Sequence, residues 1–185
     1  MAAPDDHNIK NLNGQWTMNK TISDDFDPIL AMQGVGWLTR KAIALATITL
    51  IVKQYEGDEP GNPTHIDIQQ VVTGGISGTT ELRCLDWEFR EHSDSIFGAV
   101  KGRSRWTKLE DVEDDFLKNG WLEGEARGDR GLVQSYVESK DNGWIANQIW
   151  GFEEIDGKRY YVRHVVVTKG EERKQARLVY DFKQE

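Results

Sequence analysis

Cysteine, histidine and proline are scarce in this sequence of 185 residues, which contains one cysteine, four histidines and four prolines. Because Cys84 is alone, the chain cannot form an internal disulfide, and we expect an intracellular, reducing compartment. The histidines, at positions 7, 65, 92 and 164, lack the spacing of metal ligands, so we expect no metal site. Nucleophile elbows, phosphate-binding loops and dinucleotide fingerprints are also missing, and we expect no cofactor.

Long apolar runs and an excess of positive charge are missing as well. No run approaches the roughly 18–20 apolar residues of a membrane span, and the first ten residues, MAAPDDHNIK, lack the apolar core of a secretory signal. The net charge of −8 argues against nucleic acids and anionic membrane surfaces as partners, because both attract basic proteins. We therefore expect a cytoplasmic protein that binds no nucleic acid and inserts into no membrane.

Aromatic residues, in contrast, are abundant, with seven tryptophans and five tyrosines. Each brings a large apolar area, and each of these two residue types also has a polar tip, which suits a ligand pocket as well as a core. The length predicts one domain over residues 1–185. We expect its first segment, residues 1–11, to be loose.

The only clearly helical pattern lies at residues 24–46. Ser23-Asp-Asp25 supplies capping side chains, and Pro28 falls in the first turn, where its missing N–H costs least. Gly34-Val-Gly36 interrupts the pattern, and a second apolar stripe runs from Trp37 to Leu45. Each piece is too short to persist alone in water, so the pair must lie on an apolar surface.

Nearly everything after the helical pair alternates like β-strand between turn sequences such as Asp141-Asn-Gly143. Consecutive hairpins favour an all-β, antiparallel up-and-down barrel whose closure removes exposed edges. About ten strands enclose a cavity, because wall side chains cannot fill so wide a barrel, and the helical pair can cover its mouth as a lid. We expect strands at 13–22, 47–55, 65–73, 79–89, 96–107, 121–126, 132–139, 144–152, 160–168 and 173–182, so that residues 47–182 supply the rest of the barrel.

Gly14-x-Trp16, then Phe26-Asp27, then GVGWLTRK from Gly34 to Lys41 give residues 12–53 an order that resembles the intracellular fatty-acid-binding protein branch of the calycins. This lipocalin-like family has a helix–turn–helix lid and a ten-stranded barrel, and the resemblance implies that fold here. Its last strand often carries an inward Arg-x-Tyr pair that binds a fatty carboxylate. Here Arg177 and Tyr180 are three residues apart and point to opposite faces, so ordinary fatty-acid carriage is not expected.

Taken whole, with GVGWLTRK and the stretch QIWGFEE at Gln148–Glu154, the chain resembles a set of small fungal proteins. Some of these act as hetero-Diels–Alderases in tropolone–sesquiterpenoid biosynthesis. The resemblance implies a pericyclase that joins a tropolone-derived quinone methide to a sesquiterpene alkene such as humulene, and it supplies no residue roles. A non-catalytic carrier of an apolar or aromatic small molecule explains the lid, cavity and aromatic residues equally well and stays the alternative.

Strand alternation is the only guide to which residues face the cavity. Trp144 and Trp150 share a face with the amide of Gln148, an arrangement typical of ligand pockets. A cycloaddition needs partners held in a dry cavity and a hydrogen-bond donor for the heterodiene carbonyl, but no nucleophile. The candidate catalytic residues are Tyr136, Gln148, Tyr161, Arg163 and His164, and the candidates for substrate binding are Trp16, Trp37, Arg83, Trp106, Trp144, Trp150 and Tyr180.

Overall fold

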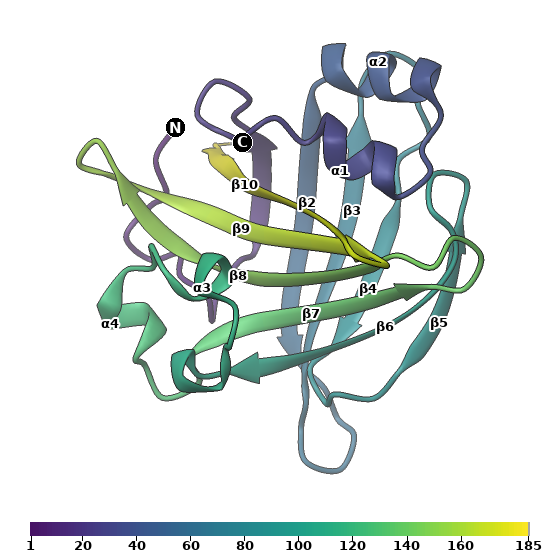
Figure 1. Cartoon of the computed structure of the whole chain (residues 1–185). Helices are drawn as coiled ribbons and strands as arrows, with labels where there is room; N and C mark the ends of the chain where they lie inside the picture. Colours follow the sequence, from purple (N-terminus) through teal and green to yellow (C-terminus); the bar gives the residue numbers. More distant parts are fainter. Residues whose placement is uncertain (185) are drawn as a thin grey trace.

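The computed structural model describes residues 1–184, and its main element is one antiparallel sheet of ten strands (Figure 1). The strand order is β4-β3-β2-β1-β10-β9-β8-β7-β6-β5, so all neighbours except β1 and β10 are consecutive in the chain. This meander confirms the predicted all-β, up-and-down architecture. The strands are β1 (Gly14–Met18), β2 (Ile48–Glu56), β3 (Thr64–Val72), β4 (Thr80–Cys84), β5 (Arg90–Asp94), β6 (Gly98–Thr107), β7 (Leu132–Ser139), β8 (Ile145–Ile155), β9 (Lys158–Lys169) and β10 (Glu172–Lys183).

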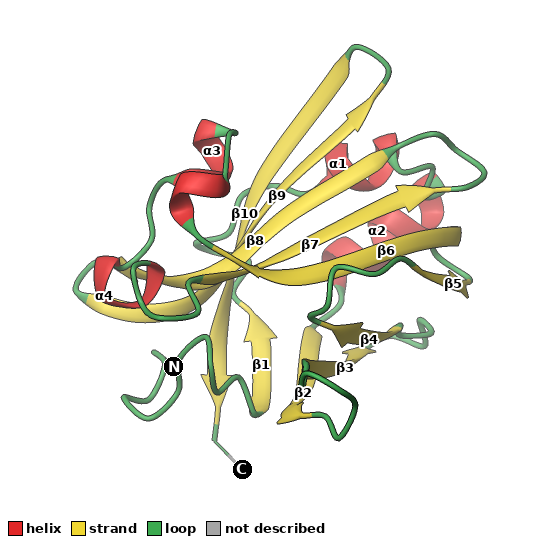
Figure 2. Ribbon diagram, turned by 90° about the horizontal axis from the view of Figure 1, so that it is seen from below, coloured by secondary structure: helices red, strands yellow, loops and turns green. Residues whose placement is uncertain are grey.

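The sheet curls on itself, but its hydrogen-bonded ladder stays open between β4 and β5 (Figure 2). These two strands are the ends of the sheet, whereas the predicted closed barrel has no ends. The inward side of β5 carries Arg90, His92 and Asp94, and inward charges are one way in which edge strands avoid pairing. The predicted strand at 79–89 accordingly ends at Cys84, and the chain turns through Trp87, whose φ is 65°, before β5 begins.

Two short helices, α1 (Asp27–Met32) and α2 (Trp37–Leu45), cover one end of the curled sheet and confirm the predicted lid (Figure 1). α1 buries Ile29 and Leu30, and α2 buries Ile43. The side chain of Arg40 on α2 joins the two helices, because its Nε donates to Asp27 Oδ1 at 3.0 Å. Among residues 1–184, no helix has the length and hydropathy needed to cross a membrane.

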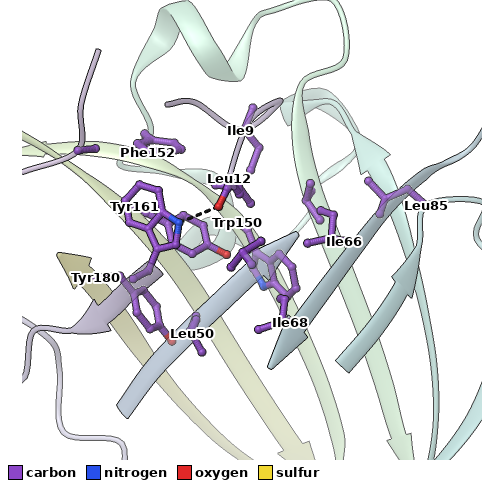
Figure 3. Close-up of a cluster of buried hydrophobic side chains, with 14 residues drawn as sticks. Ile9, Leu12, Leu50, Ile66, Ile68, Leu85, Trp150, Phe152, Tyr161 and Tyr180 are labelled. Carbon is purple, nitrogen blue, oxygen red and sulfur yellow. Dashed lines mark hydrogen bonds between the residues drawn. The ribbon is translucent and has the colours of Figure 1, made fainter. Parts of the chain in front are cut away.

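The end of the barrel opposite the lid is closed by the N-terminal segment. Residues 1–11 are not loose as predicted, since the amide of Ala3 donates to Arg159 O at 2.7 Å and Ile9 is buried. Leu12 O accepts a hydrogen bond from Trp16 Nε1 at 2.8 Å, and both residues belong to a buried cluster that we call the base cluster (Figure 3). So short a segment has no periodicity to interpret, and its apolar side chains become ordered only against the barrel.

A segment outside the barrel, residues 109–126, packs on the outer face of β8 and β9. It contains a 3-10 turn at Leu109–Asp111 and the one-turn helices α3 (Asp115–Lys118) and α4 (Glu123–Ala126). The predicted strand at 121–126 is therefore wrong. Trp121 is anchored by its Nε1, which donates to Leu117 O at 2.9 Å, and one-turn helices are too short to show helical periodicity. The predicted count of ten strands is nevertheless right, because the false strand at 121–126 is offset by β5, which was not predicted.

Candidate active site

A cavity of about 430 Å³ lies between the lid and the base cluster. This volume falls within the roughly 300–1,000 Å³ of small-molecule sites. The part of the cavity nearest the lid is apolar, and Trp144 is held there by its Nε1, which donates to Gln33 O at 3.0 Å. The apolar lining includes Ile29, Leu30, Val72, Trp144, Val165 and Leu178.

The part of the cavity nearest the base cluster is polar and charged. It is lined by Glu81 and Arg83 from β4, Ser104 from β6, Gln148 from β8 and Arg163 from β9, and we call these five residues the polar floor. Glu81 Oε2 lies 3.0 Å from Arg83 Nη2 and 3.9 Å from Arg163 Nη1. One carboxylate therefore faces two guanidinium groups.

Arg83 reaches across the open side of the sheet toward β6. A Cβ atom built on Gly102 would lie 3.5 Å from Arg83 Nη1, so the missing side chain at that position leaves room for the guanidinium group. Ser104 follows Gly102 on the same face of β6, because alternate residues of a strand share a face. The polar floor thus joins side chains of β4 and β6 on the inner side of the open edge.

Arg163 is buried, with 4% of its surface exposed, and two neighbours fix its orientation. Its Nε donates to the Tyr161 hydroxyl at 2.9 Å, and its Cζ lies 3.9 Å from the centre of the Trp150 ring. Trp150 Nε1 in turn donates to Gln148 Oε1 at 2.9 Å. The Gln148 amide oxygen therefore accepts from Trp150, and within residues 1–184 its NH₂ group has no hydrogen-bond partner.

Several hydrogen-bonding atoms of the polar floor have no partner in the described part of the chain. They are Arg83 Nε, Arg163 Nη2 and Ser104 Oγ, all of them buried. Buried polar groups in native proteins are nearly always paired, so a concentration of unpaired ones in one cavity marks a place where a ligand supplies the partner. Every one of these three groups can donate a hydrogen bond.

Burial and charge set the protonation of the titratable groups around the floor. Burial by itself raises the pKa of Glu81, but Arg83 and Arg163 outweigh it and lower that pKa below its ordinary value. Burial raises the pKa of Tyr161 and of Tyr180, whose phenol groups therefore stay protonated and neutral. The floor combines an ionised carboxylate and two cations, and two neutral phenols of the base cluster lie next to it.

The cavity brings together five of the twelve candidate residues, namely Arg83, Trp144, Gln148, Arg163 and Tyr180. Tyr161 belongs to the base cluster (Figure 3), and its hydroxyl accepts a hydrogen bond from Arg163 Nε. Trp16 and Trp150 are also in the base cluster, and Trp106 packs against it while its Nε1 donates to Thr64 Oγ1 at 3.2 Å. These three tryptophans do not line the cavity, because the polar floor lies between them and it.

Three candidates point away from the cavity, on the outer face of the sheet or of the lid. His164 is on the outer face of β9, where it contacts Glu153 and lies under Phe116 and Trp121. Tyr136 is on the outer face of β7, with the Arg103 guanidinium 5.3 Å from its ring. The alternation of side chains along the predicted strand at 160–168 put His164 on the face opposite Tyr161 and Arg163, but it did not show which of the two faces points into the cavity.

Trp37 is the third, with 63% of its surface exposed on the outside of α2. The apolar stripe predicted for the second helix faces the solvent, since Leu38 and Leu45 are exposed as well. α2 rests on the barrel through Ile43 instead, a residue outside that stripe. The stripe is real in the sequence, but it does not mark the buried side of this helix.

The sequence interpretation missed two residues of the polar floor, Glu81 and Ser104. Glu81 is two positions before Arg83, so alternation places both on one face of β4, and this signal was available. Ser104 carries no such signal, because a lone serine on a cavity-facing strand resembles any other small side chain. Its significance comes from its unpaired hydroxyl, which only the structure reveals.

Comparison with known proteins identifies the family. No family model matches the chain. The chain is 34% identical over 184 residues to the pericyclase pydY of Acremonium sp, covering 98% of this chain and 97% of that protein. It is 33% identical over 181 residues to the probable pericyclase scpY of Mollisia scopiformis, covering 98% and 94%.

Solved structures agree on the fold. The fatty-acid-binding protein 1 of Echinococcus granulosus is 18% identical with a TM-score of 0.58, covering 94% of this chain and 98% of that one. The REP1-NXSQ fatty acid transporter is 16% identical with a TM-score of 0.59, covering 94% and 97%. Such low identities show the architecture alone, whereas the two full-length relatives show the family. This chain is an enzyme that belongs to the pericyclase family of pydY and scpY.

Proposed function

We propose that this pericyclase is a hetero-Diels–Alderase, which joins an oxygen-containing diene to an alkene inside the barrel. The substrates that we propose are a tropolone-derived quinone methide and a sesquiterpene alkene such as humulene. One observation carries the proposal: unpaired hydrogen-bond donors gather at one end of a cavity whose other end, beneath the lid, is apolar. An apolar alkene suits the end beneath the lid, and a polar heterodiene suits the floor.

The fixed planar groups of the cavity support this orientation. Trp144 is held by Gln33 and by the edge of Phe97, whose ring centre lies 6.2 Å away, so its indole offers a rigid apolar wall at the end proposed for the alkene. Holding both partners in a reactive orientation is worth up to about 7–11 kcal/mol of the activation barrier. Such orientation needs no nucleophile and no change in the covalent structure of the protein.

The cycloaddition can be assisted by a hydrogen bond from the floor to the carbonyl oxygen of the heterodiene. The terminal carbon of the heterodiene and its carbonyl oxygen each form a bond to one alkene carbon, so one C–C and one C–O bond replace π bonds and no atom is lost. A donor to the carbonyl oxygen lowers the energy of this transition state, because it polarises the diene. The free NH₂ group of Gln148 is the proposed donor, with Arg163 beside it, and one such donor contributes about 3 kcal/mol.

The test mixes the purified protein with humulene and a hydroxymethyl tropolone, which gives the quinone methide by losing one molecule of water. It then follows the adduct and its stereochemistry. We expect one stereoisomer, formed faster than with heat-denatured protein. Gln148→Glu keeps the oxygen that accepts from Trp150 Nε1 but replaces the donor, and we expect a loss of about 10²–10³ in kcat. Gln69→Glu is the matched control, because Gln69 is exposed on the outer face of β3.

Equal rates for native and heat-denatured protein, with mixed stereochemistry, exclude this pair of substrates. If the native protein forms the adduct and Gln148→Glu matches Gln69→Glu, Gln148 is not the donor.

A further inference from the structure

The buried layer of the polar floor has more positive than negative charge. Arg83 and Arg163 contribute two cations and Glu81 one anion, which leaves a net charge of 2 − 1 = +1. Tyr161 and Tyr180, the other titratable groups of this layer, remain neutral. Taking an uncompensated charge out of water costs several kcal/mol, so the cavity favours a ligand that supplies the missing negative charge.

The other charged residues of the cavity lining are exposed or engaged elsewhere. Glu88 is exposed, and the Arg103 guanidinium lies 4.1 and 4.5 Å from the ring centres of Trp87 and Phe89. Arg90 and Glu91 line the outer rim between β4 and β5. Arg90 forms an ion pair with Asp86, and Glu91 forms one with Lys140. Asp94 accepts from the backbone amides of Ile96 and Phe97, both at 2.8 Å, and so belongs to the turn that follows β5. His92 is half exposed on the same strand.

The two arginines differ in how free they are to bind a ligand. Arg83 donates to Glu81 at 3.0 Å and is already paired. Arg163 lies 3.9 Å from Glu81, beyond hydrogen-bond distance, and its Nη2 has no partner in the described residues. Because Tyr161 and Trp150 fix the plane of the Arg163 guanidinium, its outer edge is a rigid pair of donors, the geometry that favours bidentate binding of an oxyanion.

We propose that the floor binds the substrate as an oxyanion, the conjugate base of an acidic enol or phenol-like hydroxyl on a planar conjugated group, with Arg163 as its main partner. This inference rests on the proposed function, since it specifies the class of the substrate that enters the same cavity. When no ligand is bound, the negative charge of Glu81 reduces the positive charge of the floor, and its hydrogen bond holds Arg83 in place. The binding energy of the anion offsets the cost of the buried cation.

The test uses two ligands of one shape and different charge, 2-naphthoate and 2-naphthamide, titrated at pH 7.5 by the quenching of tryptophan fluorescence. The wild-type protein should bind the anion about tenfold or more tightly than the amide, because hydrogen bonds to a charged group are worth more than neutral ones. Arg163→Gln should remove this preference. Arg105→Gln, on the outer face of β6, is the matched control and should leave it unchanged.

Glu81→Gln gives the sharper result, because it is expected to act in the opposite direction. Removing the only carboxylate of the floor raises its net charge, so naphthoate should bind several-fold more tightly while naphthamide changes little. Arg163→Lys, which keeps the charge and loses the planar fork, should retain part of the preference and serves if Arg163→Gln fails to fold. The proposal is overturned if Glu81→Gln weakens naphthoate, or if the wild-type protein binds both ligands equally.

The titration involves no reaction, so its outcome is independent of the cycloaddition. Anion preference without adduct formation leaves the oxyanion site standing and rejects the proposed substrate pair. Adduct formation without anion preference keeps the hetero-Diels–Alder proposal and rejects the oxyanion.

Discussion

Replacing His164 by phenylalanine should destabilise the protein strongly and leave the chemistry intact. His164 is 4% exposed on the outer face of β9, and its Nδ1 lies 2.7 Å from Phe116 O. A carbonyl only accepts, so Nδ1 donates to it, and Nε2 contacts the buried carboxylate of Glu153. Arg177 Nη1 contacts the other oxygen of Glu153 at 3.2 Å.

Phenylalanine fits among the rings of Trp121 and Phe116, whose centres lie 4.2 and 5.0 Å from that of His164, but it leaves Glu153 with Arg177 as its one partner. Breaking a buried pair in this way costs about 3–5 kcal/mol. For a chain of this length each kcal/mol lowers the melting temperature by about 2–4 °C, so we expect a fall of about 6–20 °C. Glu153→Gln should cost less, because an amide donates to Nε2 and accepts from Arg177.

The assay compares unfolding curves in urea with the rate of product formation at a temperature below both melting points. His164→Phe should lower the free energy of unfolding while kcat stays within about threefold of the wild-type value. Unchanged stability with a large loss of rate would show that His164 takes part in the reaction, and the assignment of the site to the cavity side of β9 would be refuted.

Three further predictions follow from single contacts. Lys20→Met removes the Nζ that donates to Ile43 O and Ala44 O at 2.8 Å, at the end of α2, so amide hydrogen exchange over residues 37–46 should accelerate about tenfold or more; unchanged exchange would mean that Lys20 does not hold the lid. Ser104→Ala deletes a hydroxyl without a partner, so the free energy of unfolding should change by less than about 0.5 kcal/mol while the rate of product formation falls; a large loss of stability would contradict this. Burial raises the pKa of Cys84 to about 11, so the thiolate is scarce below that pH, and alkylation by iodoacetamide at pH 8 should be far slower in the native than in the urea-unfolded protein.

Alternation along the longest strands predicted the direction of some cavity side chains. It grouped Gln148 of β8 with Trp144, the residue before that strand, and on β10 it placed Tyr180 inward and Arg177 outward, as the structure has them. These strands are 11 and 12 residues long, so a period of two repeats often enough to be clear. Short elements lack this repetition, which is why the five residues of β5 and the one-turn helix α4 were missed.

Other features depend on packing that no local pattern encodes. His164 is buried only because the segment at 109–126 covers the outer face of β9, so a strand that is apolar on both faces did not tell inside from outside. The polar floor joins residues of β4, β6, β8 and β9 that lie up to 82 positions apart, from Glu81 to Arg163. Its unpaired donors are a property of that assembly and of no single strand.

The central claim is that the barrel cavity is where the cycloaddition takes place, and two adjacent residues of β3 test it directly. Val72 lines the cavity and is 9% exposed, whereas Val71 points outward and is 41% exposed. The measurement is kcat/KM of Val72→Trp and Val71→Trp, with melting curves to show that both variants are folded. We expect Val72→Trp to lose about a hundredfold or more, because the indole fills the space of the substrates, and Val71→Trp to keep the wild-type value. Wild-type activity in both folded variants would contradict the claim that the reaction takes place in this cavity.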